Sequence, residues 1–256
     1  IFDGTARGLT EAPHLFQRDR WYYLTTAEGG TGYRLAVTMA RARAITGPYE
    51  THPDLFLMST ADAPDHPVQR TGHGQYVEAP DGTAWHTFLM GRPIAGPDGA
   101  GRFCPMGRET GIERCQWRNG WLYLEDGGLL PRAEVPASVA SPPPEEVHYD
   151  FCDPPLSDDF QWLRTPAPQR IFRMGAGGLT LIGRESIGSW FEQSLMARRQ
   201  ADFAYRAETE LDVDPRHYQH AAGLTTYYNR HKFHALLVSW EPGIGRCLRI
   251  ESCPGD

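Results

Sequence analysis

The sequence lacks the features that define several large protein classes. No apolar run approaches about 18 residues, so we expect no membrane-spanning helix. The formal net charge of −7 leaves no basic excess, which argues against a nucleic-acid partner. The N-terminal residues show no basic segment followed by an apolar one, so we expect no signal peptide. A neutral or apolar partner such as a sugar fits this composition better.

Cysteine is sparse and scattered. The five cysteines form no CxxC pair, which argues against a zinc site or a dense disulfide framework. Reduced thiols in a cytoplasm are the simpler interpretation. The glycine-rich residues 28–33 lack the phosphate-loop motif, so we interpret them as a tight loop in which Tyr33 offers its ring to a sugar. No long amphipathic helix is apparent.

Turn-forming and aromatic residues are abundant instead. The chain has 27 glycines, 21 prolines and 11% aromatic residues, a composition that favours an all-β protein. A polar turn followed by an aromatic-rich strand recurs at residues 17–24, 81–89 and 118–124. Such recurrence is typical of propeller blades. Unrelated hairpins in another β-fold explain it equally well.

The second half of the sequence has a different pattern. Residues 141–144 are Ser-Pro-Pro-Pro, and we interpret residues 131–145 as a linker between domains. Residues 203–214 alternate between apolar and charged side chains, which predicts a strand with one buried face. Further predicted strands at 224–228, 233–240 and 247–250 are joined by short turns. Together they indicate a sandwich from residue 146 to 256.

Three polar residues are candidates for chemistry. Glu11 stands just before a predicted strand, where a carboxyl group can serve as a general acid, although a solvated loop residue is the alternative. His73 follows a glycine at a strand start and can face a central channel, or it can be a hydrogen-bonded structural histidine. Arg108 offers a fork of donors to sugar hydroxyls, or it forms a surface salt bridge with Glu109 or another acid.

Several segments taken together resemble one known family. Residues 9–15, Leu-Thr-Glu-Ala-Pro-His-Leu, resemble the TEGPH segment of the β-xylosidases of glycoside hydrolase family 43. Further segments follow in that family's order at residues 28–33, 36–42, 45–50, 71–74, 91–93, 107–110, 160–166 and 191–200. The resemblance covers nearly the whole chain.

The resemblance implies a fold and an activity. We expect the C-terminal part of a five-bladed β-propeller at residues 1–130, the linker, and a truncated concanavalin-like β-sandwich at residues 146–256. The implied reaction is inverting exo-hydrolysis of β-1,4-xylosides from xylo-oligosaccharides, with α-L-arabinofuranosides as further candidate substrates. Glu11 would be the general acid, Arg108 would contact the sugar and His73 would lie at the central channel. The family requires no cofactor, some members hold calcium at that channel, and a homo-oligomer is compatible with it.

Two departures from the family pattern bear on activity. Ala12 replaces the usual glycine after the acid. The family's two catalytic aspartates, one of them the base, match no residue here and are expected before Ile1. We therefore expect this chain alone to be inactive. The rival hypothesis is a non-catalytic carbohydrate-binding protein. The sequence leaves xyloside against arabinoside preference, metal content and oligomeric state open.

Overall fold

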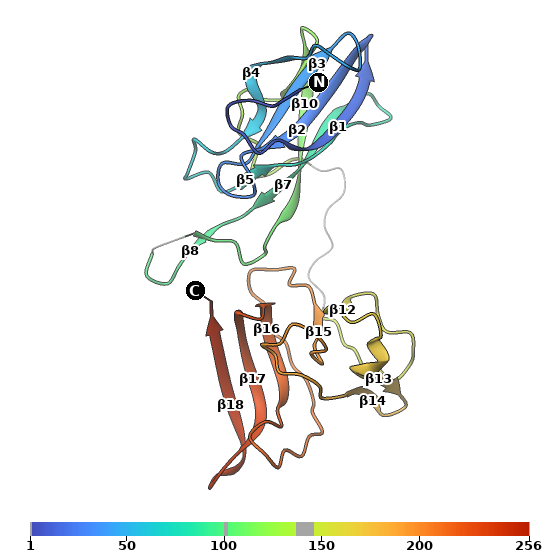
Figure 1. Ribbon diagram of the computed structural model, residues 1–256, viewed down its shortest axis with the longest axis vertical. Coiled ribbons are helices and arrows are strands. Elements are labelled where there is room, and N and C mark those ends of the chain that lie inside the picture. The colour runs from blue at the N-terminus through green and yellow to red at the C-terminus, as the bar shows by residue number, and fades with distance from the viewer. Residues whose placement is uncertain (1, 100–101, 137–145, 256) are drawn as a thin grey trace. The chain divides into compact units, whose positions relative to one another are not determined.

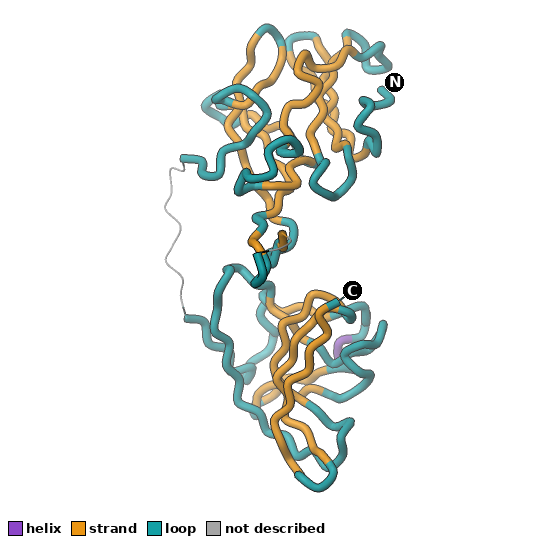
Figure 2. Tube along the Cα trace, turned by 90° about the vertical axis from the view of Figure 1, so that its left-hand side faces the viewer, coloured by secondary structure: helices purple, strands orange, loops and turns teal. Residues whose placement is uncertain are grey.

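The computed structural model describes residues 2–99, 102–136 and 146–255. The chain divides into two compact units, Ile1–Pro142 and Pro143–Asp256, which are treated separately below (Figures 1 and 2). The boundary between the units falls inside the predicted linker, residues 131–145, of which residues 137–145 lie outside the described part of the chain.

The first unit is built from two antiparallel sheets and a small hairpin. The first sheet has the order β1-β2-β3-β4, with β1 Glu11–Arg18, β2 Trp21–Glu28, β3 Ala36–Ala42 and β4 Glu50–Ser59. The second has the order β11-β10-β7-β5, with β6 also paired to β7; its strands are β5 Gln69–Gly72, β6 Tyr76–Glu78, β7 Ala84–Gly91, β10 Glu109–Arg118 and β11 Trp121–Leu124. The hairpin pairs β8 Ile94–Ala95 with β9 Arg102–Phe103.

Two of the predicted turns have the backbone geometry that tight hairpins require. Asp19 and Arg20 connect β1 to β2 with φ values of 50° and 65°. Asn119 and Gly120 connect β10 to β11 with φ values of 52° and 73°. Positive φ at both central residues matches the right-handed twist of the flanking strands. The predicted strand-turn-strand segments at 17–24 and 118–124 are therefore confirmed.

The two sheets of the first unit pack against each other around a buried core. This core contains Tyr23, Val37, Met39, Leu57, Met58, Val68, Ala84, Phe88, Cys115, Trp121, Leu122 and Leu124. Apart from Val68, which directly precedes β5, its members come from β2, β3, β4, β7, β10 and β11, so neither sheet can bury its apolar face without the other. Burial of this kind supplies roughly 25 cal/mol for each Å² of apolar surface removed from water.

The second unit is also made of strands. Its largest sheet has the order β16-β17-β18, with β16 Ala222–Asn229, β17 Lys232–Glu241 and β18 Gly245–Pro254. Two smaller sheets pair β12 Phe160–Trp162 with β15 Met196–Arg198, and β13 Phe172–Gly175 with β14 Gly178–Leu181. Apart from the 3-10 turn Pro168–Arg170, the described residues contain no helix, which confirms the all-β prediction.

One predicted strand is wrong. Residues 203–214, whose side chains alternate so regularly, form no strand. Burial still alternates near their end, with Leu211 and Val213 half-buried and Asp212 and Asp214 exposed. The apolar side chains Phe203 and Tyr205 are exposed, so the start of this segment has no buried face. A strand also needs a neighbour to receive its backbone hydrogen bonds.

The described residues include no helix that is long and apolar enough to cross a membrane.

His86, in the middle of β7, is the most deeply buried titratable ring in the first unit. It is 0% exposed, and neither ring nitrogen has a hydrogen-bond partner among the described residues. Its cross-strand neighbours are Tyr76 on β6 and Glu113 on β10. Burial lowers the pKa of His86 from 6.5 to about 4, against an opposing effect of the Thr87 backbone and with a further lowering by nearby His14.

This histidine makes stability depend on pH. Between pH 6.5 and about 4, His86 is protonated in the unfolded chain but neutral in the folded chain. The unfolding free energy therefore falls as the pH is lowered through that window. We predict that His86→Leu reduces the loss of unfolding free energy between pH 7 and pH 4 by up to about 3 kcal/mol, since one pKa unit is about 1.4 kcal/mol. Urea unfolding at pH 7, 6, 5 and 4 measures it. If the unfolding free energy of the variant fell with pH as steeply as that of the wild type, the lowered pKa of His86 would be contradicted.

Candidate functional site

Glu11 lies where the regular pairing of β1 breaks down. It is the first residue of β1, it is exposed, and it stands opposite Ala27 on β2. The register shifts between Glu11 and His14, and Ala12 within that bulge has a φ of 51°. Bulges of this kind re-aim side chains and are frequent beside active sites. The described residues give the Glu11 carboxylate no hydrogen bond or ion pair, so it is available to a ligand.

The loop that leads into Glu11 is fastened to the end of β2. The Glu28 carboxylate, which is 0% exposed, accepts hydrogen bonds from the Thr5 backbone N–H at 2.9 Å, from the Thr5 hydroxyl, and from the Thr10 hydroxyl at 3.3 Å. The Gly29 N–H donates to the Gly8 carbonyl at 2.8 Å. The glycine-rich turn after β2 therefore holds the segment that precedes Glu11.

His73 lies near the same end of the first sheet. The cross-strand pairs Glu11–Ala27 and Glu28–Ala36 run across β1, β2 and β3 at this end. With strands about 4.8 Å apart, Ala36 is roughly 10 Å from Glu11. A Cβ on Gly72 would come within 3.0 Å of the Ala36 carbonyl oxygen, so the backbone just before His73 touches β3.

The backbone at His73 is shaped by close approach on both sides. His73 is exposed and has a φ of 53°. A Cβ at Gly72 would meet the Leu35 side chain at 2.4 Å, and one at Gly74 would meet the Thr87 carbonyl oxygen at 1.6 Å. Only glycine fits either position without a shift. The Gly-His-Gly sequence therefore fixes His73 tightly at the surface.

Tyr33 is engaged by two arginines. The Arg70 guanidinium carbon lies 4.7 Å from the centre of its ring and that of Arg102 lies 4.4 Å away. The Tyr33 hydroxyl donates to the Arg102 carbonyl at 3.2 Å. These contacts connect the loop after β2 to β5, which carries Arg70 shortly before His73, and to β9. A sugar platform at Tyr33 stays a prediction, and its ring already carries two cation–π contacts.

Arg108 is exposed and directly precedes β10. Its neighbour Glu109 is held by Arg92, with Nη2 to Oε1 at 2.6 Å and Nε to Oε2 at 3.0 Å. A fork of this kind is a strong, geometrically specific pairing. Glu109, one of the acids considered as a salt-bridge partner for Arg108, thus binds Arg92. Arg108 lies on the same connecting segment as Arg102, which contacts Tyr33.

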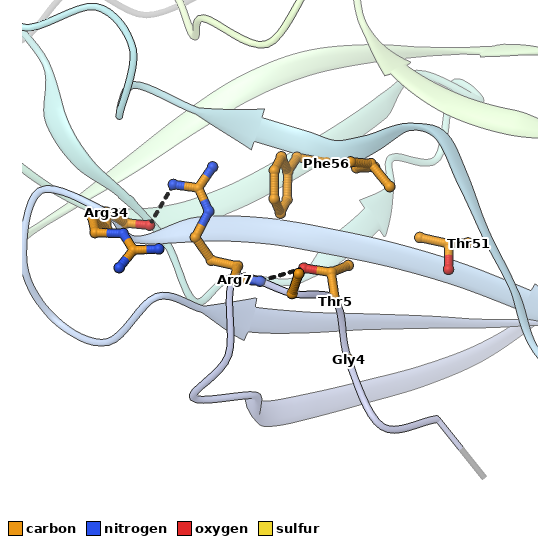
Figure 3. A pocket seen from close by; sticks show the side chains of 8 residues that line it. Gly4, Thr5, Arg7, Arg34, Thr51 and Phe56 are labelled. Carbon is orange, nitrogen blue, oxygen red and sulfur yellow. Dashed lines mark hydrogen bonds between the residues drawn. The ribbon is translucent and has the colours of Figure 1, made fainter.

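A shallow pocket of about 470 Å³ lies beside residues 4–7 of the N-terminal loop (Figure 3). Its lining residues are Gly4, Thr5, Ala6, Arg7, Arg34, Thr51, Leu55 and Phe56. Arg7 lies over the Phe56 ring at 4.6 Å and donates to the Arg34 carbonyl at 3.3 Å, as Figure 3 shows. None of Glu11, Tyr33, His73 and Arg108 lines this pocket, so we do not place the proposed chemistry there.

Calcium at a propeller centre stays a prediction. Within residues 2–99, 102–136 and 146–255, no group of three or more His, Cys, Asp or Glu side chains lies together as a metal site would require. The donor set that calcium prefers is six to eight oxygens.

The arrangement of these residues suits acid catalysis on a neutral ligand. One end of the first unit presents an exposed carboxyl group at Glu11 and an exposed imidazole at His73, on backbone that neighbours hold firmly. A guanidinium at Arg108 lies on a segment connected to Tyr33. A carboxyl group can give a proton to a leaving oxygen, and arginine forks can orient hydroxyl groups.

Comparison with known families identifies both units. Residues 1–122 match the model for glycosyl hydrolases family 43, and residues 148–256 match the model for the β-xylosidase C-terminal concanavalin A-like domain. The two-unit all-β architecture is therefore part of a propeller followed by a concanavalin-like domain, as the sequence predicted. The chain belongs to glycosyl hydrolase family 43.

Individual relatives agree with the family models. The chain is 49% identical over 247 residues to xylosidase/arabinosidase 43B of Humicola insolens, covering 93% of this chain and 44% of that protein. It is 38% identical to a β-xylosidase of Bacillus subtilis (strain 168), covering 99% of this chain and 49% of that protein. The crystal structure of xylan β-1,4-xylosidase from Bacillus halodurans C-125 aligns with a TM-score of 0.86 and 38% identity, covering 100% of this chain and 49% of that one. The chain spans about half the length of the curated relatives it matches.

Sequence reasoning missed the role of Glu28. It was read only as the first residue of a glycine-rich loop, whereas the structure buries it against Thr5 and Thr10. The available signal was a carboxylate that ends a strand whose other residues are mainly apolar or hydroxyl-bearing. Its partners lie 18 and 23 positions earlier, so only the folded loop brings them together.

The left-handed backbone at Ala12 gives a test of the local geometry. An L-residue with a Cβ pays roughly 1 kcal/mol or more for this conformation, and glycine does not. We predict that Ala12→Gly raises the unfolding free energy by about 1 kcal/mol, measured by urea unfolding of the chain.

The matched control is Ala27→Gly, which changes the buried residue opposite Glu11 where φ is not positive. Glycine there should lower the unfolding free energy by a similar amount, because it adds unfolded-state freedom and removes a packed methyl group. Destabilisation by both substitutions would contradict the left-handed conformation at Ala12.

Proposed function

We propose that this chain carries the general-acid part of an inverting glycosidase that removes xylose from the ends of xylo-oligosaccharides. Glu11 is the general acid. α-L-Arabinofuranosides are the second substrate class, supported by the name of the Humicola insolens relative, a xylosidase/arabinosidase.

The observation that carries the proposal is the setting of Glu11. The residue is exposed at a bulge, and its carboxylate has no partner among the described residues. A carboxylate with only a structural role would be expected to bind a neighbouring arginine or backbone N–H, as Glu109 and Glu28 do here. Its match to the family's TEGPH segment adds an independent argument.

In the proposed reaction Glu11 protonates the glycosidic oxygen as the bond to the leaving sugar breaks. A water, activated by a base on the opposite face of the sugar ring, attacks the anomeric carbon and inverts its configuration. Arg108 and His73 bind hydroxyl groups of the terminal sugar. Tyr33 borders the site through its contacts with Arg70 and Arg102.

The base is proposed to lie outside these 256 residues. An inverting enzyme places its two carboxyl groups about 6.5–9.5 Å apart, which leaves room for the water. The buried carboxylate nearest to Glu11 along the sheet, Glu28, is already committed to Thr5 and Thr10. The resemblance places both family aspartates in a segment that this chain does not contain.

Glu11→Gln tests the acid role in the complete gene product, meaning the longest polypeptide encoded around these residues. Glutamine keeps the shape but cannot give up a proton, so we predict a loss in kcat of about 10²–10⁴-fold on xylobiose. The loss should be much smaller on dinitrophenyl β-xyloside, because that leaving group needs little protonation. Steady-state kinetics on both substrates measure the difference.

The matched control is Glu50→Gln, an exposed carboxylate on β4 that pairs with Arg41. It should not change the ratio of the two rates. Equal losses on both substrates in Glu11→Gln would argue against the acid role. Sugar binding without turnover by the unmodified gene product would favour the rival carbohydrate-binding function.

A further inference from the structure

Glu28 is an unusual carboxylate because it is buried and bonds no cationic side chain in the described part of the chain. Its side chain is 0% exposed, and its hydrogen bonds among the described residues come from one backbone N–H and two threonine hydroxyls. A buried charge is costly unless donors surround it. The loop that supplies those donors is therefore held firmly in the folded protein.

The other buried carboxylate of the first unit shows the usual solution. Glu113 on β10 is 1% exposed and binds Arg132 through Nε at 2.9 Å and Nη2 at 2.6 Å. That pair joins β10 to the segment after β11 and lies on the second sheet. Glu28 instead binds the segment that ends at Glu11, so its donors are part of the proposed site.

The backbone beside Glu11 needs this support. Leu9 and Ala12 both have left-handed backbone, with φ of 54° and 51°. Such conformations persist only where the surroundings hold them. Thr10, which bonds to Glu28, is the residue between Leu9 and Glu11. The bond therefore acts one residue away from the proposed general acid.

We propose that Glu28 is a positioning residue, which acts through Thr10 to fix the carboxyl group of Glu11 against the glycosidic oxygen. The inference rests on the proposed function. Proton transfer depends on placement, and a misplacement of about 1 Å can cost about 10²-fold in rate. Loss of the hydrogen bond between Thr10 and Glu28 should therefore slow the reaction most on substrates whose leaving group needs protonation.

Two substitutions in the complete gene product separate positioning from simple folding. Glu28→Gln keeps the shape but replaces one acceptor oxygen with an NH2 donor, so at least one of the hydrogen bonds donated to Glu28 must break or reverse its direction. Thr10→Val keeps the shape and removes the hydroxyl, while the bonds from Thr5 to Glu28 remain. We expect both to lower kcat on xylobiose by about 10- to 100-fold with little change in KM, and to lower it much less on dinitrophenyl β-xyloside.

The controls are a conservative rescue and a matched buried carboxylate. Thr10→Ser keeps the hydroxyl and should retain the wild-type ratio of the two rates. Glu113→Gln should lower the melting temperature but leave that ratio unchanged, because Glu113 lies on β10 of the other sheet and binds Arg132 on the segment after β11. The same change of ratio in Glu113→Gln would overturn the inference, since general loosening would then explain it.

The outcome for Glu11→Gln keeps this inference apart from the proposed function. The leaving-group signature is a loss of kcat that is much larger on xylobiose than on dinitrophenyl β-xyloside. If Glu11→Gln shows it and neither Glu28→Gln nor Thr10→Val does, Glu28 is structural and this inference alone is overturned. If Glu11→Gln lacks the signature, the acid role fails and the inference fails with it. The signature in all three variants, with Thr10→Ser like wild type, supports both.

Discussion

The candidate site depends on the contact between the two sheets of the first unit, and Arg41 is part of that contact. Arg41 on β3 lies against Trp21 of the first sheet at 4.2 Å and against Trp121 of the second at 4.1 Å. It also donates to Glu50 at 2.6 Å and to the Gly120 carbonyl. A planar guanidinium can stack and donate at once, which a lysine cannot do. The position of one sheet against the other follows from this contact together with the buried core and further bonds between the sheets, such as that from the Tyr23 hydroxyl to the Gly120 carbonyl at 2.8 Å.

The candidate site is then built from irregular backbone on that rigid frame. Glu11 lies at a bulge, His73 has left-handed backbone between two glycines, and Glu28 fastens the loop before Glu11. Regular strands would place side chains in a simple alternation and leave no freedom to aim them. The sheets supply position, and the departures from regular pairing supply direction.

Local sequence signals predicted part of this structure. Turn residues such as Asn119-Gly120 identified a hairpin because they specify a backbone conformation by themselves. The alternation in residues 203–214 misled, because a regular pattern in the sequence ensures neither a buried face nor a neighbouring strand, and Phe203 and Tyr205 are in fact exposed. The pairing of Glu109 with Arg92 and the burial of Glu28 were out of reach because they depend on segments brought together only by folding.

Resemblance to a family supplied what local signals could not. The motif around Glu11 assigned it a role that a lone exposed glutamate would not have suggested, and the family models confirm the membership over both units. The roles of Glu11, His73, Arg108 and Tyr33 stay predictions. The structure contributes the neighbours through which they can be tested.

The central claim is that these 256 residues hold the acid of the site but not its base. The most direct measurement is turnover of dinitrophenyl β-xyloside by the 256-residue chain, beside the complete gene product at equal concentration. Dinitrophenolate leaves without protonation, so the assay depends on the base and not on Glu11. The account predicts turnover by the complete product and none by the chain. Turnover by the chain would contradict it and reveal a base among these residues.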